Sequence, residues 1–195
     1  MLLQPVFINF LGIDYLTDID NDLLQKYCIK KRALQEVDQN KESTILDINA
    51  PELQLLVKSI KSRLKNIHNL VKMKDSYTIA LEKAWCNIDN NINIDSPHCH
   101  PLSAFSIVYY VAGQEDSGSI QFMNPSPGMM NSQIGQGKCI KEFDEFNSNA
   151  WTIDPEPGKL LIFPSWLVHF VHQNKSNNRR ISIAFDTEII LKGNN

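Results

Sequence analysis

The sequence predicts a mainly β protein, a barrel or a sandwich, whose helices lie near the N-terminus and cover one face of a sheet. After residue 77, short apolar runs rich in β-branched and aromatic residues alternate with turns marked by Gly, Pro and Asn. Before it, apolar residues recur every three or four positions, which is typical of amphipathic helices. The 195 residues suffice for one domain with a sizeable core, and no linker or internal repeat divides residues 1–195.

The first segment, residues 1–76, is expected to form the helical support of the barrel. Residues 2–10 alternate loosely between apolar and polar and predict a strand. Asp20 can cap a first helix, because its side chain can accept a hydrogen bond from a backbone N–H of the first turn. The apolar stripe of that helix is formed by Leu23, Leu24, Tyr27 and Cys28.

A polar stretch separates the first helix from a second. Residues 36–49 predict a loop, and Asn49 as a cap with Pro51 in the first turn marks the start of the second helix. The apolar stripe of this helix consists of Leu53, Leu56, Val57, Ile60, Leu64, Ile67 and Val71. Such a stripe predicts a surface that packs on the core, not a cofactor site.

The second segment, residues 77–190, is expected to form the β core. Strands are predicted at residues 77–88, 104–111, 119–123, 151–153, 159–163, 167–172 and 179–190. Residues 124–149 are rich in Pro, Gly, Asn and Ser and lack periodicity, and loops of this length are uncommon inside a compact domain. We interpret them as either a substrate lid or a disordered insertion.

The composition argues against several kinds of partner and location. The net charge is −3 and no dense Lys/Arg block occurs, so nucleic acid is not a favoured partner. No apolar run approaches the roughly 20 residues of a membrane span, so no membrane association is expected. The four cysteines form no Cys-x-x-Cys pair and no secretory signal is recognisable, which predicts a cytoplasmic protein with reduced thiols.

Three of the five histidines lie in two segments that suggest a metal site. His98 and His100 are two residues apart, so in an extended strand both side chains would project from one face. His169 would come from another strand of the same barrel. Three imidazoles can hold one transition-metal ion. A polar turn with two surface histidines and a buried third is the plainer alternative, but the three together favour a metal.

Arg180 and Ser182 lie eleven and thirteen residues after His169 and share one face of the last predicted strand. A buried arginine needs an anion, and its guanidinium is well shaped to bind a carboxylate in bidentate fashion. Beside a metal, this pair suggests a dicarboxylate co-substrate whose other end binds the metal. The alternative is a surface arginine, which is what we expect of Arg179. The side chains on the opposite strand face are Ile181, Ile183 and Phe185.

Several motifs occur in the same order as in a known enzyme family. They are Trp85–Asn87, Pro97–Pro101, Phe105–Val111, Ser117–Gly118, Pro157–His169 and Arg180–Phe185. With them the chain resembles the 2-oxoglutarate- and Fe(II)-dependent oxygenases, and within these a small bacterial and phage branch. It is also similar to aspartyl β-hydroxylase. The resemblance implies a double-stranded β-helix, the jelly-roll barrel shared with cupins, with helices packed on one sheet.

The same resemblance implies an oxidoreductase, in most cases a hydroxylase, that couples decarboxylation of 2-oxoglutarate to oxidation of a substrate. His98 and His169 would bind Fe(II), while Arg180 and Ser182 would bind the far carboxylate of 2-oxoglutarate. Tyr109 would add a hydrogen bond to this co-substrate. The residues expected around these groups are Trp85, Asn87 and Trp166. No catalytic residue is implied beyond the metal ligands.

The chain departs from the family pattern at His100. Most members have Asp or Glu two residues after the first histidine, where this chain has an imidazole. Two interpretations follow: His100 is a third imidazole ligand, or it lies beside the iron while water fills that position, as in aspartyl β-hydroxylase. We include His100 among the predicted ligands, because three ligands on one side leave open positions suited to non-haem iron.

Two other classes of protein are compatible with the sequence. Residues 158–169 resemble the second cupin motif, and a cupin would be an isomerase, a three-histidine dioxygenase or a small-molecule binding module that does not use 2-oxoglutarate. A barrel that has lost catalysis is the other class. Succinate production separates the oxygenase from the cupin, and metal content separates both from the third class. The sequence leaves open whether the substrate is a small molecule or a protein side chain, and whether the chain forms a homodimer.

Overall fold

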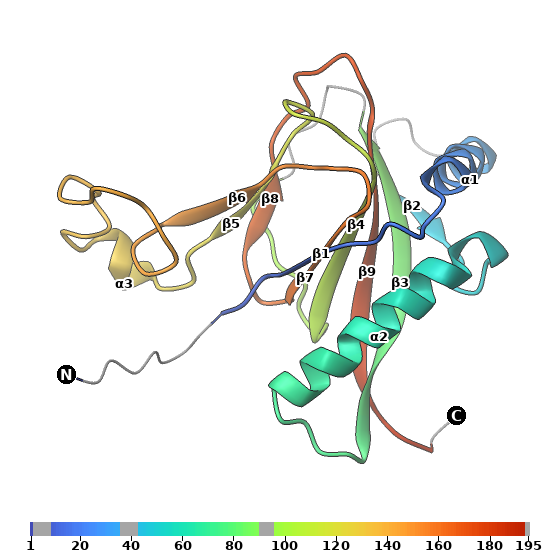
Figure 1. The fold of residues 1–195 in the computed structure, drawn as a ribbon, viewed down its shortest axis with the longest axis horizontal. Helices are drawn as coiled ribbons and strands as arrows, with labels where there is room; N and C mark the ends of the chain where they lie inside the picture. The colour runs from blue at the N-terminus through green and yellow to red at the C-terminus, as the bar shows by residue number, and fades with distance from the viewer. Residues whose placement is uncertain (2–8, 36–42, 90–95, 194–195) are drawn as a thin grey trace.

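The described strands form two antiparallel sheets (Figure 1). The computed structural model describes residue 1 and residues 9–35, 43–89 and 96–193. The larger sheet has the order β1-β7-β4-β9-β3-β2, and the smaller has the order β6-β5-β8. The strands of the larger sheet are β1 (Gly12–Tyr15), β2 (Ser43–Leu46), β3 (Tyr77–Asp89), β4 (Phe105–Ala112), β7 (Lys159–Pro164) and β9 (Arg180–Leu191). Those of the smaller are β5 (Ile120–Met123), β6 (Ala150–Ile153) and β8 (His169–Val171).

Two helices cover one face of the larger sheet. Helix α1 (Asn21–Leu34) begins as predicted, with the Asp20 carboxylate accepting from the Leu23 N–H at 2.9 Å. Helix α2 (Gln54–Leu70) follows a short 3-10 turn, η1 (Pro51–Leu53), whose N-cap residue is Ala50. The predicted cap at Asn49 is wrong, because its N–H bonds to the Asp47 carboxylate in the turn before the helix.

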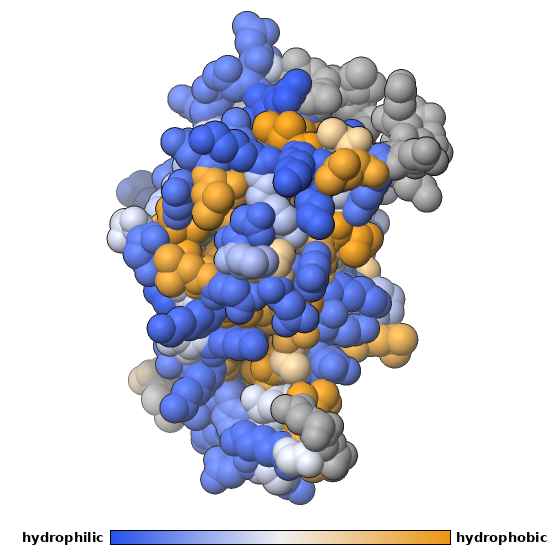
Figure 2. All heavy atoms as spheres, turned by 90° about the vertical axis from the view of Figure 1, so that its right-hand side faces the viewer, coloured by the Kyte–Doolittle hydropathy of each residue, from blue (hydrophilic) through white to orange (hydrophobic). Residues whose placement is uncertain are grey.

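The inner faces of these helices and of the sheet share one apolar core. The sheet contributes the buried side chains of Ile181, Ile183 and Phe185 from β9, as the strand pattern predicted. Leu24 of α1 and Leu56 and Ile60 of α2 pack into the same cluster. The outward face of this helical side is mainly hydrophilic, and its hydrophobic side chains form small separate groups (Figure 2). None of the helices described here is long and apolar enough to cross a bilayer.

The N-terminal part contributes strands as well as helices. β1 pairs with β7 and β2 pairs with β3, so both short strands extend the edges of the larger sheet. Residues 43–46, predicted as loop, therefore form a strand. Their alternation, exposed then buried, is too short to stand out from the polar stretch around it. The expected strand at residues 2–10 lies mostly outside the described residues.

The segment 124–149 forms the far end of the β5–β6 hairpin, which extends away from the barrel (Figure 1). It contains a single helical turn, α3 (Pro127–Met130), between irregular turns. Among the described residues, none in this segment lines the cavity at the centre of the molecule. The structure therefore supplies no contact that would make the segment a substrate lid.

Candidate metal and co-substrate site

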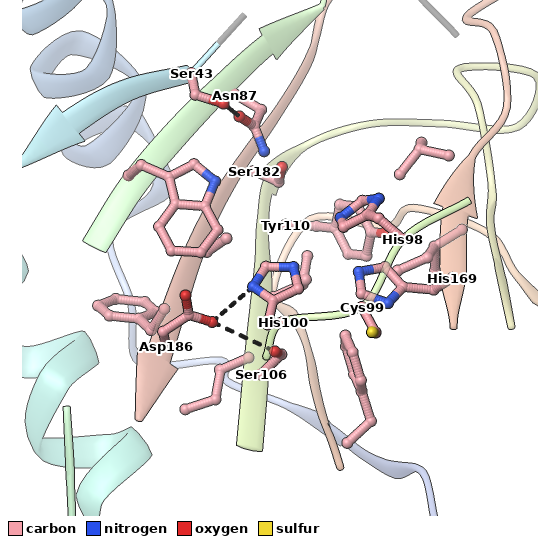
Figure 3. A pocket seen from close by; sticks show the side chains of 18 of the residues that line it. Ser43, Asn87, His98, Cys99, His100, Ser106, Tyr110, His169, Ser182 and Asp186 are labelled. Carbon is pink, nitrogen blue, oxygen red and sulfur yellow. Dashed lines mark hydrogen bonds and ion pairs between the residues drawn. The ribbon is translucent and has the colours of Figure 1, made fainter. Parts of the chain in front are cut away.

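Three histidines meet at one point on the wall of a cavity between the two sheets. One nitrogen each of His98, His100 and His169 lies within 4.8 Å of the others. The ring centroids of His98 and His169 are 4.5 Å apart. The His100 centroid lies 5.2 Å from that of His98 and 5.4 Å from that of His169. Figure 3 shows the three rings turned toward one another. This is the arrangement that three imidazole ligands of one metal ion require.

Backbone pairing brings the distant histidines together. His98 and His169 each donate their N–H to the other's carbonyl at 2.9 Å, which forms an isolated antiparallel bridge beside β8. The His100 N–H bonds to the carbonyl of Ser165 at 2.9 Å. The expected regular strand through His98 and His100 is absent, but the extended backbone still places both imidazoles on one side.

Each histidine is oriented through its Nδ1 atom. Nδ1 of His98 lies 2.8 Å from the Ser96 carbonyl, and Nδ1 of His169 lies 2.9 Å from the Leu167 carbonyl. Nδ1 of His100 lies 2.8 Å from Oδ1 of Asp186. An acceptor at Nδ1 holds the proton there and leaves the Nε2 lone pair free to bind a metal.

His169 is the most buried of the three, with 4% of its surface exposed. Phe163 packs edge-on against its ring at a centroid distance of 4.9 Å. The pKa of His169 is lowered to about 4, mainly by burial and also by the neighbouring His98 and His100, while the Leu167 carbonyl and Asp186 oppose this shift. The imidazole is therefore neutral near pH 7, which is the state that binds metal.

This shift predicts that the metal-free protein loses stability as the pH falls from about 6.5 to about 4. Above pH 6.5 His169 is neutral in both states, but in this window only the unfolded chain binds the proton. The drop attributable to His169 should reach about 3 kcal/mol at the acid end. Urea unfolding at several pH values measures it, with His169→Gln as the matched control. An equal pH dependence in the variant would contradict the assignment.

The histidines border a cavity of about 490 Å³, which lies within the size range of ligand sites (Figure 3). From β3, Trp85 stacks on His100 at a centroid distance of 5.8 Å and an interplanar angle of 16°. Asn87 lies further along the same strand and accepts a hydrogen bond from Ser43 at 2.7 Å. Both residues line the cavity.

Arg180 and Ser182 line the same cavity, and both are buried. The Arg180 guanidinium makes an ion pair with Asp89 at 2.9 Å and donates to the carbonyls of Ser117 and Gly118, each at 2.9 Å. The predicted inward orientation is present. The buried charge therefore does not by itself require a bound ligand, because the chain supplies the carboxylate of Asp89.

Tyr109, the predicted co-substrate contact, faces the other way. It lies in the core beneath the helices, where its hydroxyl donates to Asn21 at 2.8 Å, and burial raises its pKa to about 12. Its neighbour Tyr110 lines the cavity instead. Burial also raises the pKa of Tyr110, although Arg180 opposes this, so the phenol keeps the proton it could donate to a ligand.

Comparison with known families shows which family the chain belongs to. Residues 83–186 match the model of a family described as "Putative 2OG-Fe(II) oxygenase", where 2OG is 2-oxoglutarate. The match covers more than half of the chain and includes the three histidines, Arg180 and Ser182. The chain belongs to the 2-oxoglutarate- and Fe(II)-dependent oxygenase family. In a sequence search, no curated protein matches this oxygenase significantly.

Solved structures confirm the double-stranded β-helix of the oxygenase. A prolyl-4-hydroxylase from Pseudomonas putida has a TM-score of 0.60 and 14% identity, with 91% of this chain and 92% of that chain covered. The α-ketoglutarate-dependent epimerase SnoN from nogalamycin biosynthesis has a TM-score of 0.60 and 12% identity, covering 96% and 84%. HygX from Streptomyces hygroscopicus, with nickel and 2-oxoglutarate bound, has a TM-score of 0.59 and 11% identity, covering 91% and 82%.

Membership of the family makes this chain an oxidoreductase that uses Fe(II) and 2-oxoglutarate. The donor set fits the metal: three imidazoles converge, each is held through Nδ1, and the most buried of them is neutral. The family also decides against a cupin that does not use 2-oxoglutarate. Which of the histidines bind iron stays a prediction.

Three further residues of the oxygenase differ from what the sequence predicted. Trp166 does not line the cavity: the residue is 58% exposed, and its indole N–H donates to Asn9 at 3.1 Å. Asp89 and Asp186 were missed. Asp186 shares the strand parity of Arg180 and Ser182, so the sequence carried a signal for it. The sequence carried no comparable signal for Asp89, because its partner Arg180 lies on the neighbouring strand, directly opposite it in the β3–β9 pairing.

His172 is expected to be unnecessary for metal binding. It is exposed and bonds to the Gln121 side chain at 2.9 Å, away from the three converging histidines. His172→Ala should therefore retain one Fe(II) per chain, measured by metal analysis after anaerobic loading and desalting. If this variant loses iron as severely as His169→Ala, the assignment of ligands is wrong.

Proposed function

We propose that this oxygenase hydroxylates a small molecule or a protein side chain, with Fe(II) held by His98, His100 and His169. The observation that carries the ligand assignment is the convergence of the three rings, each with its Nδ1 atom already bonded. Arg180, Ser182 and Tyr110 would bind the far carboxylate of 2-oxoglutarate. Tyr110 takes the role that the sequence gave to Tyr109.

The positions of these side chains support a division of the cavity into two parts. The histidines lie at one part, while Arg180 lies toward the end of β9 that pairs with Asp89. A dicarboxylate that bridges the two would present its keto acid end to the metal and its far carboxylate to the guanidinium. Arg180 can bind a second carboxylate because a guanidinium has five N–H donors in a planar fork.

Bound Fe(II) and 2-oxoglutarate supply the oxidising chemistry, in which O₂ converts 2-oxoglutarate to succinate and carbon dioxide and one oxygen atom enters the substrate. The chain's own residues orient the participants and keep water out. Trp85 restrains the ring of His100 by stacking on it, and Phe163 and Phe122 pack around His169. Packed aromatic side chains that exclude water strengthen the electrostatic interactions within the site.

Anaerobic reconstitution tests the proposal. Fe(II) and then 2-oxoglutarate are added to the protein, and a weak visible charge-transfer band should appear only when both are present. Admission of oxygen should then yield succinate, slowly without a substrate and faster with one. The matched control is His169→Ala, which should give neither. Stoichiometric Fe(II) binding with no band and no succinate would contradict the proposed co-substrate site while leaving the metal site intact.

A further inference from the structure

One of the three histidines has a partner of a different kind. His98 and His169 each use a neutral carbonyl two residues earlier in the chain as the acceptor for Nδ1. His100 instead uses the Asp186 carboxylate, at 2.8 Å. In both residues the side chain is mostly buried, 17% exposed for His100 and 16% for Asp186, so water screens the pair only weakly.

The negative charge of Asp186 is directed at His100 and not neutralised elsewhere. Its Oδ1 atom also accepts from the Ser106 hydroxyl at 3.4 Å, which is a neutral group (Figure 3). In the described part of the chain, no Lys or Arg side chain pairs with Asp186, and Arg180 on the same strand pairs with Asp89. The carboxylate therefore has His100 as its closest polar partner.

The position of this pair coincides with the departure from the family pattern. His100 is the residue that departs from the pattern the resemblance implied, and the Asp186 carboxylate lies one hydrogen bond beyond it. Three neutral imidazoles leave the full charge of Fe(II) at the site, whereas two imidazoles and one carboxylate reduce it by one. With Asp186 included, the local charge is again reduced by one.

We propose that Asp186 supplies, through His100, a negative charge that partly balances the charge of the bound metal. Asp186 is thus a positioning residue for the metal: it holds the His100 proton on Nδ1 and makes Nε2 a stronger donor. Carboxylate partners of metal-bound histidines act in this way, and their loss typically lowers metal affinity by about 10- to 100-fold. The inference rests on the proposed assignment of His100 as a ligand.

Loss of the Asp186 charge should affect the binding of Fe(II) and of 2-oxoglutarate differently. Removing the charge at Asp186 should weaken binding of the Fe(II) cation. It should leave binding of the 2-oxoglutarate dianion to the metal-loaded site unchanged or tighter, because the site is then more positive. A variant that only distorts the site would weaken both.

The decisive variant is Asp186→Asn, which keeps the size and a hydrogen bond but removes the charge. Fe(II) affinity, measured anaerobically by competition with a chromogenic chelator, should fall by about 10- to 100-fold. The affinity of the iron-saturated variant for 2-oxoglutarate should not fall. Ser106→Ala is the matched control, because it removes the neutral contact to Asp186 and should change Fe(II) affinity by less than about threefold.

A second variant, His100→Asp, separates the effect of the Asp186 charge from an effect on the shape of the site. His100→Asp places the carboxylate directly at the metal position, so adding Asp186→Asn to it should cause no further loss of Fe(II) affinity. The inference is overturned if Asp186→Asn binds Fe(II) as tightly as wild type, if it weakens Fe(II) and 2-oxoglutarate alike, or if the loss persists in the His100→Asp background. If wild-type protein itself binds no Fe(II), the metal site proposed above fails together with this inference.

Discussion

Replacing either His98 or His169 by alanine is expected to abolish stoichiometric Fe(II) binding while the protein stays folded. Each variant removes one of three converging imidazoles, and the backbone bridge between the two residues does not depend on their side chains. The loss should exceed about 100-fold in affinity, because even an outer partner of a ligand is worth about 10- to 100-fold. Succinate formation should fall with metal content.

The measurement is metal analysis after anaerobic loading, with thermal unfolding to verify the fold. His68→Ala is a matched control, since His68 lies on α2 and bonds to the Tyr77 carbonyl at 3.1 Å, remote from the site. Because metal-free His169 is buried and neutral, His169→Ala leaves no unpaired charge behind. The space left by the shortened side chain should lower the stability somewhat. Full iron occupancy in either variant would refute the ligand assignment.

Replacing Arg180 by alanine is expected to weaken 2-oxoglutarate binding by at least about tenfold while Fe(II) affinity stays nearly unchanged. The reason is that the guanidinium reaches into the cavity, where it would pair with the far carboxylate. Titration of 2-oxoglutarate into the anaerobic iron form measures the effect through the visible band. Arg179→Ala is the matched control, because Arg179 is exposed.

The ion pair between Arg180 and Asp89 requires a further variant. Loss of Arg180 breaks its ion pair with Asp89, which is 2% exposed, and breaking a buried pair typically costs about 3–5 kcal/mol of stability. Asp89→Asn combined with Arg180→Ala should recover part of that stability without recovering 2-oxoglutarate affinity. If neither Arg180→Ala nor the double variant changes 2-oxoglutarate affinity, Arg180 does not bind the co-substrate.

Much of the fold and the core of the site could be predicted because they follow from local periodicity. The two-residue spacing of His98 and His100 places both rings on one side, even though the backbone there forms a single bridge and no regular strand. The same period on β9 separates Arg180 and Ser182, which line the cavity, from the apolar residues that pack under the helices. The helical stripe of α2 was likewise readable at three- and four-residue steps.

Errors arose where a signal was too short or where two neighbours looked alike. Tyr109 and Tyr110 are adjacent and chemically identical, so only the strand parity shared with Ser106 and Val108, which also line the cavity, distinguishes them. β1 and β2 have four residues each, and their pairing with β7 and β3 depends on partners far along the chain. Trp166 was read as part of the site from its motif alone.

The sequence by itself determined the family, the candidate metal ligands and the face of the last strand that carries Arg180. Only the tertiary structure decided how charge is distributed around them. Asp89 meets Arg180 across the β3–β9 pairing, and Asp186 meets His100 over 86 residues of chain. Periodicity specifies which way a side chain points, whereas the strength of an electrostatic contact depends on distance and burial, and both of these exist only once the sheets have packed together.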